Sequence, residues 1–255
     1  MLETRTLGAT GIDVSCLGLG TVKFGRNQEV KYPQGFSLPS DVEIERLLAR
    51  ARELGINLLD TAPAYGSSEQ RIGRLLRERE QWVICSKVGE EFLNGVSQYH
   101  FDAGHVQRSV ERSLRHLHTD YLDLVLIHSD GNDLRVLESS DCVATLEKLR
   151  DKGLVRAIGM STKTVAGGRR AAELLDVVMV TLNLEQREEA VVIDHARDLD
   201  RGVLIKKALN SGHASDAVAN LRFAASYPGV SSVIVGTLSP GHLESNAQAL
   251  APSQN

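Results

Sequence analysis

Four side chains that suit proton transfer stand at related places in the sequence. Asp60 and His128 each close an apolar segment, Lys87 lies next to the end of another, and Tyr65 follows Asp60 by five residues. A tyrosine with a free pKa of about 10 is a weak acid at neutral pH, but a neighbouring ammonium group favours its ionised form. Lys87 could supply that charge, Asp60 could keep Lys87 protonated, and His128 could donate a hydrogen bond to a substrate oxygen. The four residues therefore predict proton transfer to a carbonyl oxygen.

Eight apolar segments rich in Val, Ile and Leu predict the strands that would position these side chains. They are residues 14–20, 56–60, 82–88, 121–128, 155–161, 177–183, 202–209 and 231–236. Most are continuously apolar, which is typical of parallel strands buried on both faces. Amphipathic helices are predicted between them at 42–55, 67–80, 103–117, 141–153 and 188–200, with weaker candidates at 165–175, 214–227 and 239–250.

This alternation, without a Pro- or Ser-rich linker, predicts an α/β fold in which residues 1–255 form one (β/α)₈ TIM barrel. An open doubly wound sheet is the alternative, but residues 18–25 give only a weak match to its glycine-rich turn. In a barrel the loops that follow the strands build the active site, so Asp60, Lys87 and His128 should meet at one mouth. Each residue alone also has an ordinary structural explanation, such as capping a loop. Their occurrence on three consecutive strands favours chemistry.

Composition limits the classes of function. The 255 residues are 42% hydrophobic and 24% charged, which is typical of a globular protein that needs no metal or disulfide to fold. A net charge of −4 without a Lys/Arg cluster argues against nucleic acid as a partner. Cys16, Cys85 and Cys142 are far apart and predict reduced thiols in a cytoplasmic protein. No signal peptide or membrane span is recognised, so no membrane partner is expected.

The chain resembles the aldo-keto reductases along almost its whole length. The segments LLDTAPAYGSSEQRIG, VICSKVG, DYLDLVLIHSD and GLVRAIGMST occur in the family's order. The resemblance implies a barrel closed at its bottom by a short N-terminal hairpin within residues 5–20. It implies a small-molecule carbonyl substrate, reduced by hydride from NADPH, with NADH possible, in a monomer or weak oligomer. The family's catalytic tetrad falls on Asp60, Tyr65, Lys87 and His128, with Tyr65 as the general acid.

The same resemblance implies where the cofactor binds. Ser161 would hold the nicotinamide carboxamide, and Lys207, in preference to Lys206, would neutralise the pyrophosphate. Gly236 and Thr237 lead into a helix N-terminus, which is a natural anion site. The complete set of cofactor-binding residues implied in this way is Gly20, Thr21, Ser161, Thr162, Lys207, Gly236, Thr237, His242 and Asn246.

Several of these positions depart from the family's pattern. Thr162 replaces an asparagine, while Met179 and Leu182 replace a glutamine and an aromatic residue of the nicotinamide site. His242 replaces the arginine that grips the 2′-phosphate of NADPH. Losing a bidentate phosphate contact leaves the preference between NADPH and NADH open.

Two loops are expected to wall the pocket, residues 23–40 and 89–104, with Phe24, Tyr32 and Phe92 as lining. The chain ends soon after the predicted helix at 239–250, which implies an open pocket.

Two other functions compete with the reductase. A metal-dependent hydrolase would need three or four ligands at one mouth, but only Asp60 and His128 qualify, because the HLH sequence at 116–118 belongs to the opposite face. A regulatory barrel that binds the cofactor with little turnover is the other alternative, since fold alone does not fix function.

Overall fold

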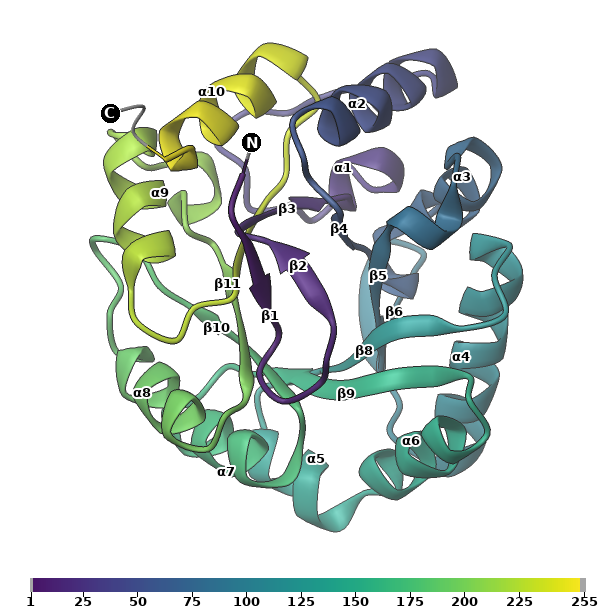
Figure 1. The fold of residues 1–255 in the computed structure, drawn as a ribbon. Helices are drawn as coiled ribbons and strands as arrows, with labels where there is room; N and C mark the ends of the chain where they lie inside the picture. The colour runs from purple at the N-terminus through teal and green to yellow at the C-terminus, as the bar shows by residue number, and fades with distance from the viewer. Residues whose placement is uncertain (1, 253–255) are drawn as a thin grey trace.

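The computed structural model describes residues 2–252, and its centre is a closed barrel of eight parallel strands (Figure 1). Neighbouring strands pair in the order in which they occur in the chain, and the last pairs with the first. The (β/α)₈ barrel predicted from the sequence is therefore confirmed. The strands are β3 (Leu17–Gly20), β4 (Leu58–Asp60), β5 (Val83–Val88), β8 (Leu122–His128), β9 (Val155–Ser161), β10 (Val177–Thr181), β11 (Gly202–Lys206) and β12 (Ser232–Val235).

Helices surround the barrel, as Figure 1 shows. The helix α2 illustrates why the sequence forms them: the Ser40 side chain caps its first turn, and the Glu43 carboxylate accepts from the Ser40 backbone in return. Its apolar stripe then packs on the strands. The longer helices are α2 (Asp41–Glu53), α3 (Ser68–Leu75), α4 (Ala103–Leu117), α6 (Cys142–Asp151), α7 (Val165–Leu174), α8 (Ala190–Asp198), α9 (Ala217–Ser226) and α10 (Pro240–Leu250). Short helices are α1 (Val22–Gly25) and α5 (Asp133–Ser139), with 3₁₀ turns η1 (Pro63–Tyr65), η2 (Arg79–Gln81) and η3 (Asn210–Gly212).

An antiparallel hairpin, β1 (Thr4–Thr6) and β2 (Asp13–Ser15), precedes the barrel and closes its bottom. Leu7, Ile12 and Val14 of this hairpin belong to the same buried cluster as barrel-interior residues such as Leu58 and Leu124. Because apolar side chains fill this end of the barrel, the open end is the one where the strands terminate. The expected hairpin within residues 5–20 is thus confirmed, although it begins before residue 5.

Several expected elements are longer than the observed ones. The predicted strand 202–209 ends at Lys206, because Lys207 adopts the left-handed conformation with φ of 55°. The predicted strand 14–20 divides between β2 and β3. The predicted helix 67–80 ends at Leu75, and Glu78 is left-handed. Apolar composition continues past the points where the backbone turns, so it overestimates element length.

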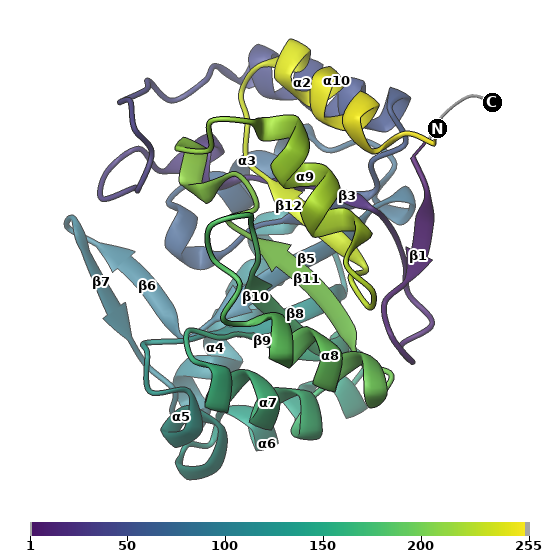
Figure 2. The same ribbon diagram turned by 90° about the vertical axis from the view of Figure 1, so that its left-hand side faces the viewer.

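A second hairpin was not predicted. β6 (Glu90–Leu93) and β7 (Val96–Tyr99) pair antiparallel around a turn at Asn94 and Gly95. Figure 2 shows this hairpin projecting from the barrel at the left of the view. It follows β5 after a single residue, Gly89, so its first residue lies beside the open end of the barrel. Among residues 2–252, no helix combines the length and apolar character needed to cross a membrane.

Candidate active site

The structure brings the four predicted proton-transfer residues to one cavity at the open end of the barrel. Asp60 is the last residue of β4, His128 is the last of β8, Lys87 lies one residue before the end of β5, and Tyr65 ends the η1 turn. All four line a cavity of about 740 Å³. This volume falls within the range of small-molecule sites in proteins.

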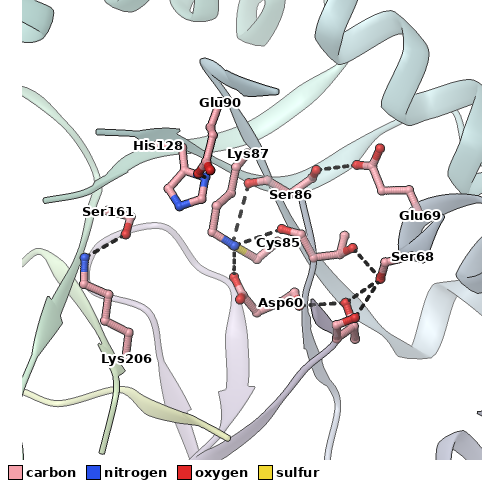
Figure 3. Close-up of polar contacts among 12 residues, drawn as sticks. Asp60, Ser68, Glu69, Cys85, Ser86, Lys87, Glu90, His128, Ser161 and Lys206 are labelled. Atoms are coloured by element: carbon pink, nitrogen blue, oxygen red, sulfur yellow. Dashed lines mark hydrogen bonds and ion pairs between the residues drawn. The ribbon is translucent and has the colours of Figure 1, made fainter. Parts of the chain in front are cut away.

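Lys87 and Asp60 form a buried ion pair at the base of this cavity (Figure 3). The Lys87 ammonium donates to Asp60 Oδ1 at 2.5 Å and to the Thr61 carbonyl oxygen at 2.9 Å. Burial by itself lowers the pKa of Lys87, but the charges of Asp60 and its neighbours outweigh burial and raise that pKa above its ordinary value. Lys87 is therefore a permanent cation in the folded protein.

Tyr65 lies directly beside this cation. Its ring centroid is 4.8 Å from Lys87 Nζ and 6.4 Å from the ring centroid of His128, with the two rings nearly perpendicular. The surrounding protein raises the pKa of Tyr65 well above its ordinary value, and Lys87 offsets only part of that rise. Lys87 lowers the pKa of Tyr65, as expected from the sequence, but burial favours the neutral phenol more strongly than the ammonium favours the phenolate.

His128 faces a carboxylate that the sequence analysis did not identify. Glu90, the first residue of β6, places Oε2 2.8 Å from His128 Nδ1, although the contact is not aligned as a linear hydrogen bond. Ser97 donates to Glu90 Oε1 at 2.6 Å, and Arg26 Nη1 lies 3.7 Å from the same oxygen. Burial opposes ionisation of Glu90, but His128, Ser97 and Arg26 together lower its pKa to about 2. Burial lowers the pKa of His128, and Glu90 opposes that shift.

A second lysine reaches into the cavity from β11. Lys206 Nζ donates to Ser161 Oγ at 2.9 Å (Figure 3). It also donates to the Thr162 carbonyl oxygen at 2.5 Å. Burial, with a smaller contribution from the cation Lys207, lowers the pKa of Lys206 to about 8 against the opposing charge of Glu189. Lys206 therefore contacts the predicted carboxamide-binding residue Ser161, whereas Lys207, preferred from the sequence, is exposed at the rim.

A second cavity of about 660 Å³ continues from the first one. The two cavities share Tyr65, His128 and Gly236 among their lining residues, so they form one cleft. The predicted cofactor residues divide along it. Gly20, Thr21, Ser161 and Thr162 line the first cavity, Thr237, His242 and Asn246 line the second, and Lys207 and Gly236 line both.

The shape and charge of the cleft fit an elongated anionic ligand. A Cβ atom on Gly236 would lie 3.1 Å from the Tyr32 hydroxyl, so a side chain there would narrow the passage between the two cavities. Helix α10 begins at Pro240, after its N-cap Ser239, and His242 of its first turn lines the second cavity, so its N-terminus offers a favourable place for a phosphate group there. Lys207 provides positive charge where the two cavities meet, and Lys206 provides it within the first cavity.

The lining residues differ in part from those expected. Tyr32 lines the cleft, as predicted. Phe24 does not: it is fully buried in the core, because the short helix α1 turns it inward. Phe92 stacks under the Arg26 guanidinium at 3.5 Å from its ring centroid. Met179 lines the cleft, but Leu182 packs in the core.

Within residues 2–252, no three His, Cys, Asp or Glu side chains come together as metal ligands. The site instead consists of one phenol, two cations, two carboxylates and one imidazole, which is a set suited to moving protons.

Comparison with known proteins gives a consistent result. The sequence profile of the Aldo/keto reductase family matches residues 16–220. The chain is 31% identical to the aldo-keto reductase YhdN of Bacillus subtilis over 205 residues, which are 77% of this chain and 59% of YhdN. It is 28% identical to a D-threo-aldose 1-dehydrogenase from Pseudomonas sp. over 234 residues, covering 80% of this chain and 68% of the relative. The chain thus spans about three fifths of the length of YhdN.

Solved structures are similar over nearly the entire chain. The crystal structure of PA4992 from Pseudomonas aeruginosa has 54% sequence identity and a TM-score of 0.89, covering 97% of this chain and 96% of that one. The holo form of AKR11C1 from Bacillus halodurans has a TM-score of 0.86 at 21% identity, covering 99% of this chain and 92% of that one. At that identity, the second likeness concerns the fold alone.

Proposed function

Because this chain belongs to the aldo-keto reductase family, we propose that it reduces an aldehyde or ketone to an alcohol with a nicotinamide cofactor, and that Tyr65 supplies the proton. The observation that carries the proposal is the geometry at the base of the cleft. Tyr65 lies between a permanent cation, Lys87, and an imidazole, His128, at the open end of the barrel. A phenol in these surroundings is held as a neutral acid beside the group that stabilises its anion.

Each member of the tetrad has a distinct part in the proposed reaction. His128 holds the carbonyl oxygen near the Tyr65 hydroxyl. A nicotinamide cofactor bound in the cleft would supply the hydride. As negative charge develops on the oxygen, the Tyr65 proton passes to it, and the phenolate left behind is stabilised by the Lys87 ammonium. Asp60 keeps that ammonium charged and fixes it in place through the 2.5 Å contact.

Several observations support a nicotinamide dinucleotide in this cleft. It extends from the tetrad past Lys206 and Lys207 to the N-terminus of α10, which gives one site for a nicotinamide and another for phosphates. We propose NADPH as the preferred form. NADH remains the alternative, because His242 stands where the family has an arginine, and a histidine cannot make the two parallel hydrogen bonds by which a guanidinium binds the 2′-phosphate. A small carbonyl compound is the proposed partner, and the cytoplasm the proposed location.

The test follows reduced-nicotinamide absorbance with 4-nitrobenzaldehyde and with a panel of aldoses, since one relative is a D-threo-aldose 1-dehydrogenase. We expect turnover, and a loss of about 10²- to 10⁴-fold in kcat for Tyr65→Phe with unchanged affinity for NADPH. Glu91→Gln, whose carboxylate pairs with His105 and Arg112 and does not line the cleft, checks that a small change beside the cleft is tolerated.

Three results distinguish the competing functions. Tight NADPH binding without turnover for any substrate would support the regulatory barrel instead. Nucleotide-independent turnover that a chelator abolishes would indicate the hydrolase. Full activity of Tyr65→Phe would contradict the assignment of the proton donor.

A further inference from the structure

We propose that Glu90 is a positioning residue that fixes which nitrogen of His128 carries a proton. Nδ1–H faces Glu90, so Nε2 can only accept a hydrogen bond from the substrate when the ring is neutral. When the ring is doubly protonated, Nε2 donates a hydrogen bond instead. The inference rests on the proposed carbonyl reduction for its kinetic consequences. The contact between Glu90, on the hairpin β6–β7, and His128 can be tested without turnover.

The two side chains face one another at close range. Glu90 Oε2 lies 2.8 Å from His128 Nδ1, and both residues line the same cavity. Figure 3 shows the Glu90 carboxylate next to one ring nitrogen, while the other nitrogen points away from it. Nδ1 is inaccessible to solvent and has no aligned hydrogen-bond partner among the described residues, so the Glu90 carboxylate is the charged group that faces it at close range. The opposite nitrogen, Nε2, is the one left for the cleft.

Glu90 remains ionised at any working pH of the protein. Its second oxygen accepts from the Ser97 hydroxyl at 2.6 Å and lies 3.7 Å from Arg26 Nη1, so both of its oxygens face proton donors or positive charge. Only about a tenth of its side chain is exposed. An ionised carboxylate has lone pairs and no proton to give.

This fixed acceptor decides the protonation of the ring. A neutral imidazole carries one N–H and one lone pair, and a lone pair on Nδ1 would face the carboxylate lone pairs at 2.8 Å, which is repulsive. An N–H on Nδ1 is attracted to the same carboxylate. The neutral ring is therefore the Nδ1–H form, and its Nε2 has only a lone pair to offer.

The consequence for chemistry depends on the substrate oxygen. A carbonyl oxygen has lone pairs only, so it can bind His128 only when Nε2 also carries a proton. An alcohol has a hydroxyl proton, so it can bind the neutral ring. Glu90 thus makes carbonyl binding, and not alcohol binding, sensitive to the charge on His128.

Other charged groups also act on the His128 ring and set the pH at which it takes up its second proton. Lys87 on β5 and Lys206 on β11 both disfavour the doubly protonated ring, as does burial, whereas Glu90 favours it. Tyr65 on η1 is neutral and faces the ring edge-on. Arg26 acts on the opposite side of Glu90. Among these groups, Glu90 is the one whose charge holds the second proton on His128.

The decisive variant is Glu90→Gln, because its amide oxygen can still accept from Nδ1–H while the negative charge is lost. Removing an opposite charge at this range lowers a pKa by about one unit or more. We expect the high-pH decline of kcat/KM for 4-nitrobenzaldehyde to move to lower pH by about that amount, which is roughly tenfold less activity at pH 7. The KM for 4-nitrobenzyl alcohol in the reverse reaction should not follow this shift.

Glu91→Gln is the matched control. Glu91 is the next residue on the same strand, but its carboxylate pairs with His105 and Arg112 on α4 and does not line the cleft. It should leave the pH profile for the aldehyde in place. A Glu90→Gln profile that coincides with the wild-type one would overturn the proposal.

Nitrogen-15 NMR of histidine-labelled protein tests the same inference without substrate. The His128 signals are assigned by their absence in His128→Asn, and the neutral ring should show a protonated Nδ1 and an unprotonated Nε2. A neutral Nε2–H form in the wild type would refute the role of Glu90 even if the enzyme is an active reductase. Absence of any turnover, with the Nδ1–H form observed, would refute the proposed function and leave the contact standing.

Discussion

The ion pair between Lys87 and Asp60 makes a quantitative prediction about stability. Asp60→Asn keeps the size of the side chain and an oxygen that can still accept from Lys87, but it removes the charge that offsets the buried ammonium. Lys87 is 2% exposed, and its remaining partner is the Thr61 carbonyl oxygen at 2.9 Å. Breaking one side of a buried pair typically costs about 3–5 kcal/mol, since the remaining charge stays out of water.

The loss of unfolding free energy in Asp60→Asn has an upper limit that depends on pH. A lysine with an unfolded pKa of about 10.4 can give up its proton at pH 7 for about 4.6 kcal/mol, because each pH unit corresponds to about 1.36 kcal/mol. In the variant the folded pKa of Lys87 falls below its unfolded value, so the unfolded state binds more protons and stability rises with pH. In the wild type the pKa of Lys87 is raised, so its contribution is complete below the unfolded pKa and is lost only as pH rises through the folded pKa.

Urea unfolding at pH 7 and pH 9 checks both statements. We expect Asp60→Asn to lose about 3–5 kcal/mol of unfolding free energy at pH 7, and the deficit to shrink by up to about 2.7 kcal/mol at pH 9. Asp198→Asn, at an exposed ion pair with Arg197, is the control and should barely change stability at either pH. A deficit for Asp60→Asn below about 1 kcal/mol, or one that is the same at both pH values, would refute the assignment of Lys87 as a buried cation.

Two further predictions concern cofactor binding. Lys206, with a pKa of about 8, should lose its charge between pH 7 and pH 9, so calorimetric affinity for NADPH should fall several-fold over that interval, and the fall should vanish in Lys206→Met; an unchanged pH dependence in the variant would place the titrating group elsewhere. His242→Arg, at the start of α10, should tighten NADPH relative to NADH by roughly 10- to 100-fold, because a hydrogen-bonded charge pair contributes about 1.5–3 kcal/mol. An unaltered ratio of the two dissociation constants would show that the 2′-phosphate binds away from residue 242.

The barrel could be predicted because its signal is long and repeated. Continuous apolar segments such as 82–88 and 121–128 can be buried on both faces only in a parallel sheet covered by helices. That placement then carries Asp60, Lys87 and His128 to one end without further information, since parallel strands all terminate at the same edge. A prediction of the barrel is therefore also a prediction that these three residues come together.

The hairpin β6–β7 had a signal that the sequence analysis passed over. Asn94 and Gly95 both have positive φ, at 52° and 80°, and an Asn-Gly pair between two short alternating segments is a strong indicator of a two-residue hairpin turn. Because residues 89–104 were expected to form one loop, no position relative to the mouth of the barrel was predicted for Glu90. A hairpin that starts one residue beyond β5 must place Glu90 beside the mouth.

Other features could not have been read from the sequence. Which of Lys206 and Lys207 contacts Ser161 depends on where β11 stops, and the left-handed backbone at Lys207 is a tertiary outcome. The direction of the Tyr65 pKa shift depends on how much protein surrounds the ring, and residue types alone do not give that amount. The sequence predicts that Lys87 lowers the pKa of Tyr65, but it gives no measure of the burial that raises that pKa.

A single short segment delivers the two charges on which the proposed chemistry depends. Lys87 lies one residue before the end of its strand and beside Tyr65, Gly89 turns the chain with φ of 105°, and Glu90 then faces His128. The turn is closed on its outer side, because a Cβ on Gly89 would lie 2.4 Å from the Phe101 ring. The cation proposed to stabilise the phenolate and the anion proposed to hold a proton on the imidazole are therefore separated by only two residues of backbone, Val88 and Gly89. In the proposed reaction, this link keeps the charge beside Tyr65 and the charge beside His128 in a fixed relation, although Lys87 belongs to the barrel and Glu90 to the projecting hairpin.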